Sequence, residues 1–129
     1  MSSEFESFVR RFPFLSFTTL DISLVPNDIS EVKPHEVELR TRFTPNHETE
    51  LPITNSPMRA IHSKELYRAI IKMGGIPIIS RSISIEEEAS IIRELKDEFS
   101  HATIAAAIST EWKRVEAVYK AGADILVND

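Results

Sequence analysis

The side chains that could perform chemistry in this chain are histidines, carboxylates, serines and arginines, because the sequence contains no cysteine. Without cysteine, a disulfide scaffold, a zinc–thiolate site and a thiol nucleophile are excluded within these 129 residues. Four histidines are present, namely His35, His47, His62 and His101. They show no HExxH spacing, so we interpret them as surface or capping residues and predict no metal site.

Charged and glycine-containing stretches exclude further ligand classes. The acidic run Glu86–Glu88 follows Ser84 in a capping-box pattern, so its carboxylates are expected to face water and complement a helix dipole rather than bind a cation. The three glycines fit neither GxGxxG nor GxxxxGKS/T, the two common nucleotide-binding loops. Fifteen Lys and Arg against 20 Asp and Glu give a net charge of −5, which argues against nucleic-acid binding.

Length and composition indicate one soluble globular domain. The fractions of 42% hydrophobic and 27% charged residues are ordinary for such a domain, and 129 residues suffice for one core. No apolar run approaches the roughly 18–20 residues of a membrane helix, and the N-terminus carries no signal-peptide core. These features predict a cytoplasmic protein that does not bind a membrane.

Strand and helix patterns alternate from Leu51 onward and would have to position any site. Short apolar runs predict four strands, at Leu51–Thr54, Ile76–Ile79, Thr103–Ile108 and Ile125–Val127. Helical spacing predicts three helices, at Ser63–Met73, from Ser84 to Phe99, and from an N-cap at Ser109-Thr110 to Gly122. This alternation predicts parallel strands joined by right-handed crossovers, in either an open sheet or a barrel.

The first half of the chain has a different pattern, because it holds six of the seven prolines. It predicts short extended pieces at Ile22–Val25 and Glu36–Phe43, the second with Val37 and Leu39 alternating with charged residues as in a half-buried strand. In the second half, the third helix is expected to be lined by Trp112, Val115 and Tyr119. We expect a shared core that includes Ile53, Ile70, Ile78, Ile92, Ala106, Val115 and Leu126.

Several motifs follow one another along the chain. The first motif begins at Leu24 and reads LVP…SEVKPHEVELRTR. The second is Ser56-Pro57-Met58, and the third begins at Gly74 and reads GGIPII. SIEE begins at Ser84, AAA…RVEA at Ala105, and the chain closes with ADILVND. In order and spacing they resemble the IMP dehydrogenase / GMP reductase family, whose corresponding motifs are LVP…SEVxPxEVDLxTR, SPMD, GGIGII, SIEEQ, GAAV…RVEAL and VDVLVID.

The resemblance implies an α/β fold of the parallel (β/α)₈ TIM-barrel type, for which ~250 residues are typical. This chain is expected to supply a half-barrel of four strands and three helices with an N-terminal extended segment. We describe it as a single partial TIM-barrel domain over residues 1–129, with residues 1–50 as the N-terminal segment and 51–129 as the barrel part. The regulatory cystathionine-β-synthase-type insertion of most IMP dehydrogenases is absent between the second helix and the third strand.

The resemblance also assigns ligand-binding residues at the carboxyl ends of the strands, where barrel active sites lie. Ser56 and Met58 correspond to contacts with the purine nucleotide substrate, the alternative being a loop serine and a buried, gap-filling methionine. Asp129 corresponds to the carboxylate that binds the nicotinamide ribose hydroxyls, and Arg81 is assigned to the same cofactor site. The alternative for Asp129 is a frayed terminal residue.

The chain departs from the family motifs at two places. Arg59 stands where the family has the Asp of SPMD, and Ser80-Arg81-Ser82 replaces HHN or HKN. The resemblance places the nucleophilic cysteine, the phosphate-gripping loops, the potassium site and the mobile flap after Asp129. We therefore assign no catalytic residue in this chain and predict that it is inactive alone.

The expected function is that of an IMP dehydrogenase-like purine nucleotide oxidoreductase, which in the complete family enzyme oxidises IMP to XMP with NAD. The alternatives are a GMP reductase-like member, which uses NADPH, and a non-catalytic half-barrel that serves binding or assembly. A half-barrel leaves open strand edges and an apolar inner face with Ile53, Ile78 and either Ala105 or Ala106. We therefore expect a homo-oligomer or a complementary C-terminal half-barrel as partner.

Overall fold

The computed structural model describes residues 32–129 and six single positions before them, at 7, 11, 18, 20, 23 and 25. The chain divides after Val37 into two units. The first contributes a short 3₁₀ helix, η1 (Pro34–Glu36), and the predicted extended piece Ile22–Val25 lies outside the continuously described residues. Within the described part of the chain, no helix has the length and apolarity to cross a membrane.

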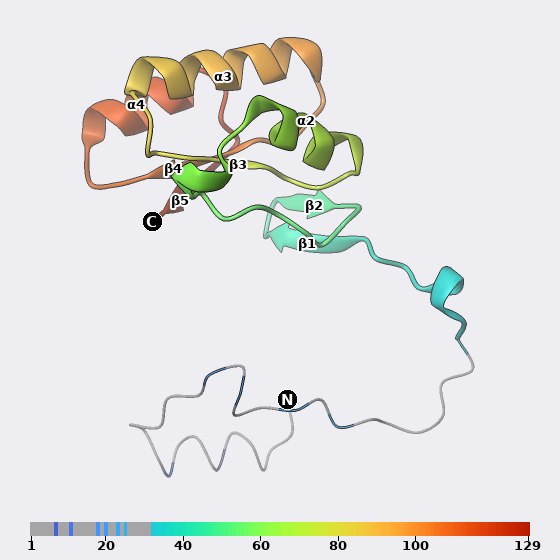
Figure 1. The fold of residues 1–129 in the computed structure, drawn as a ribbon. Helices are drawn as coiled ribbons and strands as arrows, with labels where there is room; N and C mark the ends of the chain where they lie inside the picture. The colour runs from blue at the N-terminus through green and yellow to red at the C-terminus, as the bar shows by residue number, and fades with distance from the viewer. Residues whose placement is uncertain are drawn as a thin grey trace. The chain divides into compact units, whose positions relative to one another are not determined.

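Three parallel strands form the central sheet of the second unit, Glu38–Asp129 (Figure 1). They are β3 (Ile78–Ile79), β4 (Ala105–Ile108) and β5 (Ile125–Asn128), paired in the order β3-β4-β5. Parallel strands in sequential order confirm the predicted βαβ arrangement for these elements. The fold is mixed α/β and is compatible with part of a TIM barrel.

The predicted first strand, Leu51–Thr54, is not a strand, so the described sheet has three strands rather than four. The backbone of this segment explains the difference, because Pro52 has no N–H to donate and the N–H of Ile53 donates within the segment, to the carbonyl oxygen of Leu51 at 2.8 Å. Side chains make connections instead: Thr54 Oγ1 donates to the carbonyl oxygen of Ile76 at 2.6 Å. The segment therefore lies beside β3 without extending the sheet.

The three predicted helices are present as α2 (Lys64–Lys72), α3 (Ile85–Glu98) and α4 (Trp112–Lys120). The cap predicted at Ser84 is confirmed, since its hydroxyl accepts from the backbone N–H of Glu87 at 3.1 Å, and Ser63 caps α2 in the same way at 3.0 Å. The cap predicted for α4 is wrong. Its N-cap is Glu111, which makes no side-chain capping bond, rather than the Ser109-Thr110 pair.

Two buried faces also differ from the prediction. Glu88 is fully buried instead of facing water, because three buried apolar residues stand three, four and seven positions after it on the same helix face. On α4, Val118 is buried whereas Trp112 and Tyr119 are 75% and 70% exposed. Residue 118 lies about 100° around the helix from residue 119, so the two side chains point in different directions. The face of α4 that carries Val118 is the one that packs against α3 and β4.

An antiparallel hairpin precedes the sheet and was not predicted. It consists of β1 (Thr41–Thr44) and β2 (His47–Thr49), joined by a turn at Pro45-Asn46. The predicted strand Glu36–Phe43 is therefore wrong in its bounds. Its expected burial is wrong too, since Val37 and Leu39 are about half exposed.

Apolar side chains cover both faces of the sheet. The core between the sheet and the helices α3 and α4, which lie over one face in Figure 1, includes Ile79, Ile92, Leu95, Ile104, Ala106 and Val118. On the opposite face are Ile76, Ile78, Ala105 and Ala107, with Phe43, Ile125 and Val127 packed against them.

This packing corrects two expectations. The predicted shared core is confirmed for Ile92 and Ala106, whereas Ile78 is buried in the cluster on the opposite face. Ile70 and Val115 are only partly buried, and Ile53 and Leu126 are 60% and 40% exposed. The expectation of a wholly uncovered inner face is wrong at Ile78 and Ala105, which are 7% and 0% exposed. The hairpin contributes to this burial, because Phe43 of β1 packs on that face.

Candidate functional site

The loops that follow parallel strands gather at one edge of the sheet, and such edges hold the ligand sites of barrel and open α/β proteins. Here the turn Ser56–Met58 follows the segment beside β3, the loop Ser80–Ser82 follows β3, and Asp129 follows β5. We call these residues the carboxyl edge. Every residue that the sequence assigned to a ligand lies on it.

Asn55 aligns the first of these turns with the sheet. Its side chain is buried, and its amide nitrogen donates to the carbonyl oxygen of Ile78 at 2.8 Å while its oxygen accepts from the N–H of Ile78 at 2.9 Å. The side chain thus takes the place of a neighbouring strand's backbone. Asn55 Nδ2 also donates to the carbonyl oxygen of Ser56 at 3.0 Å, which orients the start of the turn.

Ser80 joins the first turn to the second loop. It is fully buried, and its hydroxyl donates to the carbonyl oxygen of Pro57 at 2.8 Å. Its backbone N–H donates to the hydroxyl of Tyr67, a fully buried residue of α2, at 3.3 Å. Tyr67 in turn shares a 2.7 Å hydrogen bond with His62 Nδ1, and its burial raises the pKa of its phenol, so the group stays protonated.

Asn55, Ser80 and Tyr67 were missed by the sequence reasoning as positioning residues. The available signals were an asparagine directly before the SPM turn and polar residues flanking apolar runs. Such signals do not show which backbone group a side chain will meet, because that depends on the packing of α2 against β3.

The two residues assigned to the substrate lie together in the first turn. The N–H of Met58 donates to the carbonyl oxygen of Ser56 at 2.8 Å, and both residues are exposed. Met58 is 58% exposed, so the alternative of a buried, gap-filling methionine does not describe it. The substituted Arg59 opens a short 3₁₀ helix, η2 (Arg59–Ile61), and is exposed too.

The two residues assigned to the cofactor are brought into contact across 48 positions of sequence. Arg81 Nε donates to Asp129 Oδ2 at 3.3 Å, and their side chains are 41% and 48% exposed. An exposed pair of this kind adds only about 0–1 kcal/mol to stability. The Arg81–Asp129 pair therefore contributes little to the stability of the fold, and its importance lies in the charged groups that it presents to a ligand.

The carboxyl edge combines a carboxylate, a guanidinium, exposed hydroxyls and an exposed thioether. Asp129 can accept hydrogen bonds from vicinal hydroxyls, and Arg81 can donate to an anionic phosphate. Ser56 and Met58 offer a hydroxyl and an apolar surface nearby in the fold. This donor and acceptor set suits a sugar phosphate carrying a flat, partly apolar ring.

Among the described residues, no group of three or more His, Asp or Glu side chains could hold a metal ion. His62 is bonded to Tyr67, and His47 Nδ1 lies 2.8 Å from Thr44 Oγ1. His35 and His101 are exposed.

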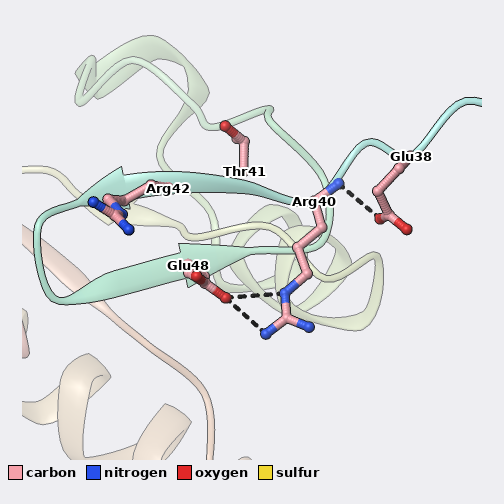
Figure 2. Close-up of a pocket in the computed structure, with 5 residues that line it drawn as sticks. All are labelled: Glu38, Arg40, Thr41, Arg42 and Glu48. Carbon is pink, nitrogen blue, oxygen red and sulfur yellow. Dashed lines mark hydrogen bonds and ion pairs between the residues drawn. The ribbon is translucent and has the colours of Figure 1, made fainter.

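A hollow lies on the β1–β2 hairpin, lined by Glu38, Arg40, Thr41, Arg42 and Glu48 (Figure 2). Two of its charged side chains, Arg40 and Glu48, are already paired with each other. Arg40 donates to Glu48 Oε2 from Nε at 3.0 Å and from Nη2 at 2.7 Å, which raises the pKa of the guanidinium, and its backbone N–H donates to Glu38 Oε1 at 3.1 Å. The carboxyl edge is the better candidate site, because it holds all the residues assigned from sequence.

Comparison with known proteins agrees with the motifs. The sequence model described as the IMP dehydrogenase / GMP reductase domain matches residues 16–129. The chain is 35% identical over 88 residues to inosine-5'-monophosphate dehydrogenase of Korarchaeum cryptofilum, covering 68% of this chain and 18% of that protein. It is 38% identical over 76 residues to the enzyme of that name from Borreliella burgdorferi, covering 59% and 19%, and 32% identical over 80 residues to that of Streptococcus pyogenes, covering 62% and 16%. The matched part is thus less than a fifth of these relatives.

Proposed function

Because the chain belongs to the IMP dehydrogenase / GMP reductase family, we propose that it is part of a purine nucleotide oxidoreductase barrel of the IMP dehydrogenase type. The observation that carries the proposal is the match over residues 16–129, together with relatives named inosine-5'-monophosphate dehydrogenase. The reaction of the complete enzyme would be the NAD-dependent oxidation of IMP to XMP.

In this proposal the carboxyl edge binds the two reactants. Ser56 and Met58 contact the purine nucleotide, the serine through its hydroxyl and the methionine through its exposed thioether. Asp129 accepts hydrogen bonds from the ribose hydroxyls of the dinucleotide, and Arg81 donates to a neighbouring phosphate oxygen. The nicotinamide ring, when bound, supplies the hydride acceptor.

The contribution of this chain to the reaction is binding and orientation. The family's covalent step needs a thiolate, and these 129 residues contain no cysteine. The nucleophile would come from residues other than these. The 129-residue chain should therefore show no IMP oxidation or GMP reduction above background.

The partner in this proposal is a further part of a barrel or a second copy of the chain, in the cytoplasm. Support comes from β5, which pairs only with β4 among the described strands, and from Leu126 at its centre, which is 40% exposed. An open strand edge beside exposed apolar surface favours pairing. Light scattering tests this, since a folded monomer at tens of micromolar would contradict self-association.

Titrations of the ¹⁵N-labelled chain with IMP and with NAD test the assigned roles. We expect IMP to shift the amide signals of residues 56–59 and NAD to shift those of residues 81 and 129. Asp129→Asn should weaken the NAD response and leave the IMP response unchanged, whereas Ser56→Ala should do the reverse. Glu116→Gln, an exposed substitution on α4, is the matched control.

The proposal fails if neither nucleotide shifts signals at the carboxyl edge. The assignment of separate residues to IMP and to NAD is wrong if Asp129→Asn weakens the binding of both equally. Turnover of IMP by the purified chain, with contaminating host enzyme excluded, would overturn the conclusion that these residues only bind and orient.

A further inference from the structure

A buried ion pair connects α3 and α4 behind the carboxyl edge. Glu88 of α3 is fully buried and Arg114 of α4 has a side chain only 11% exposed. Arg114 Nη1 donates to Glu88 Oε2, and the second nitrogen of the same fork, Nη2, donates to the backbone carbonyl oxygen of Ile83 at 3.2 Å. Arg114 thus contacts a helix and a loop at once.

The stability of the fold does not by itself account for this pair. Burying two charges costs several kcal/mol per ion before their attraction is counted, and the net result is often no more stable than an apolar substitute. Glu88 Oε1 has no hydrogen-bond partner among the described residues, so the carboxylate is incompletely compensated. The pair therefore calls for a role other than stabilisation.

The carbonyl group that Arg114 holds belongs to the loop that carries Arg81. The start of this loop is fixed at Ser80, whose N–H donates to Tyr67 and whose hydroxyl donates to Pro57. Its end is fixed at Ile83 by Arg114. Arg81 and Ser82, between the two anchors, are exposed.

We propose that Arg114, oriented by Glu88, is a positioning residue that fixes the Ser80–Ile83 loop and so presents Arg81 to Asp129. The loop is short, so a displaced end would move Arg81 directly. Only the role of this loop in holding a dinucleotide rests on the proposed function. The anchoring of the loop stands on the hydrogen bonds alone.

The planar fork of arginine is what allows both contacts, because it donates in two directions at fixed angles. A lysine at position 114 would keep the charge beside Glu88 but lacks the second nitrogen that reaches Ile83. Arg114→Lys therefore separates the anchoring of the loop from the neutralisation of Glu88. Arg114→Met removes both contacts and keeps an aliphatic stem of similar length.

Amide hydrogen exchange of the full 129-residue chain, followed by mass spectrometry, is the first test. In Arg114→Lys, a peptide spanning residues 80–84 should exchange on the order of tenfold faster than in the wild type, with exchange in β4 unchanged. Arg114→Met should show the same loop effect or a larger one. Lys120→Met is the control, because it removes a cation of α4 whose partner among the described residues is the exposed Glu116.

Binding of NAD, followed by the amide shift of Asp129, is the second test. Arg114→Lys should weaken NAD binding by about tenfold if Arg81 is misplaced, whereas Lys120→Met should leave it unchanged. Wild-type loop exchange in both Arg114 variants, an equal increase of exchange in β4, or unchanged NAD affinity despite faster loop exchange would each overturn the proposal. If the wild-type protein does not respond to NAD, the proposed function fails. The hydrogen-exchange data then still show whether Arg114 anchors the Ser80–Ile83 loop.

Discussion

Raising the pH of the 129-residue chain should destabilise its fold through Glu88. Burial raises the pKa of this carboxyl from 4.5 to about 7, although the hydrogen bond and the charge of Arg114 act in the opposite direction. The folded-state pKa therefore lies above the unfolded-state value. The stabilising proton is fully effective below pH 4.5, and its contribution is lost as the pH rises through about 7.

The size of the effect follows from the two pKa values. Each pKa unit corresponds to about 1.4 kcal/mol, so the full difference corresponds to roughly 3 kcal/mol. Most of it falls between about pH 5 and pH 8, where the folded state releases its proton while the unfolded state is already ionised. Across that range the contribution of Glu88 should fall by about 2–3 kcal/mol.

Urea denaturation of the wild type and of Glu88→Gln at several pH values isolates this contribution. The glutamine keeps an oxygen that accepts from Arg114 and does not titrate, so the variant should gain about 2–3 kcal/mol relative to the wild type between pH 5 and 8. Glu116→Gln is the control, because the hydrogen bond from Lys120 lowers the pKa of Glu116 and confines its effect to more acidic pH. A difference between wild type and Glu88→Gln that stays constant with pH would refute the reasoning, since Arg114 would then keep Glu88 ionised throughout.

Three further substitutions test the packing and the site. Ile92→Ala removes a fully buried side chain and should lower the free energy of unfolding by about 2–5 kcal/mol in urea denaturation; a neutral result would show that Ile92 is not closely packed. Asn55→Ala should cost about 1–3 kcal/mol and speed exchange of the Ile78 amide, which loses its acceptor; unchanged exchange would contradict the strand-like role of Asn55. Gly74→Ala should lower the melting temperature, because φ is +81° and a Cβ would lie 2.7 Å from the Cβ of Glu50; an unchanged melting temperature would show that the turn relaxes without strain.

Much of the fold could be predicted from sequence because local signals and packing agree there. Ser84 caps its helix as predicted, and the alternation of helices and strands gives the parallel order of β3, β4 and β5. The segment at residues 51–54 could not be read correctly from its apolar character. Whether a backbone ladder forms depends on N–H donors that point to the neighbouring strand, and here Pro52 has none while the N–H of Ile53 donates to Leu51 of the same segment.

The faces of the helices and the details of the site were harder to predict. On α4 the more conspicuous stripe of Trp112 and Tyr119 is exposed, and the smaller Val118 is buried, because a neighbouring helix and a strand select the face. Arg81 and Asp129 were named from resemblance, but their contact depends on the tertiary fold. The fully buried Glu88 was taken for a surface carboxylate because its helix-terminal position fits both interpretations.

The two sides of the central sheet differ in how they can be extended, which has a consequence for symmetry. Beside β3 the segment with Pro52 lies without forming a continuous ladder, whereas the far side of β5 carries none of the described strands. A second copy placed there by a twofold axis perpendicular to the sheet would run antiparallel to β5, in an isologous contact. A strand that completes a barrel instead continues the parallel order, and where it belongs to the same chain it arrives through a crossover of about a dozen residues or more. The direction of the strand that pairs with β5 therefore distinguishes self-association from completion of a barrel.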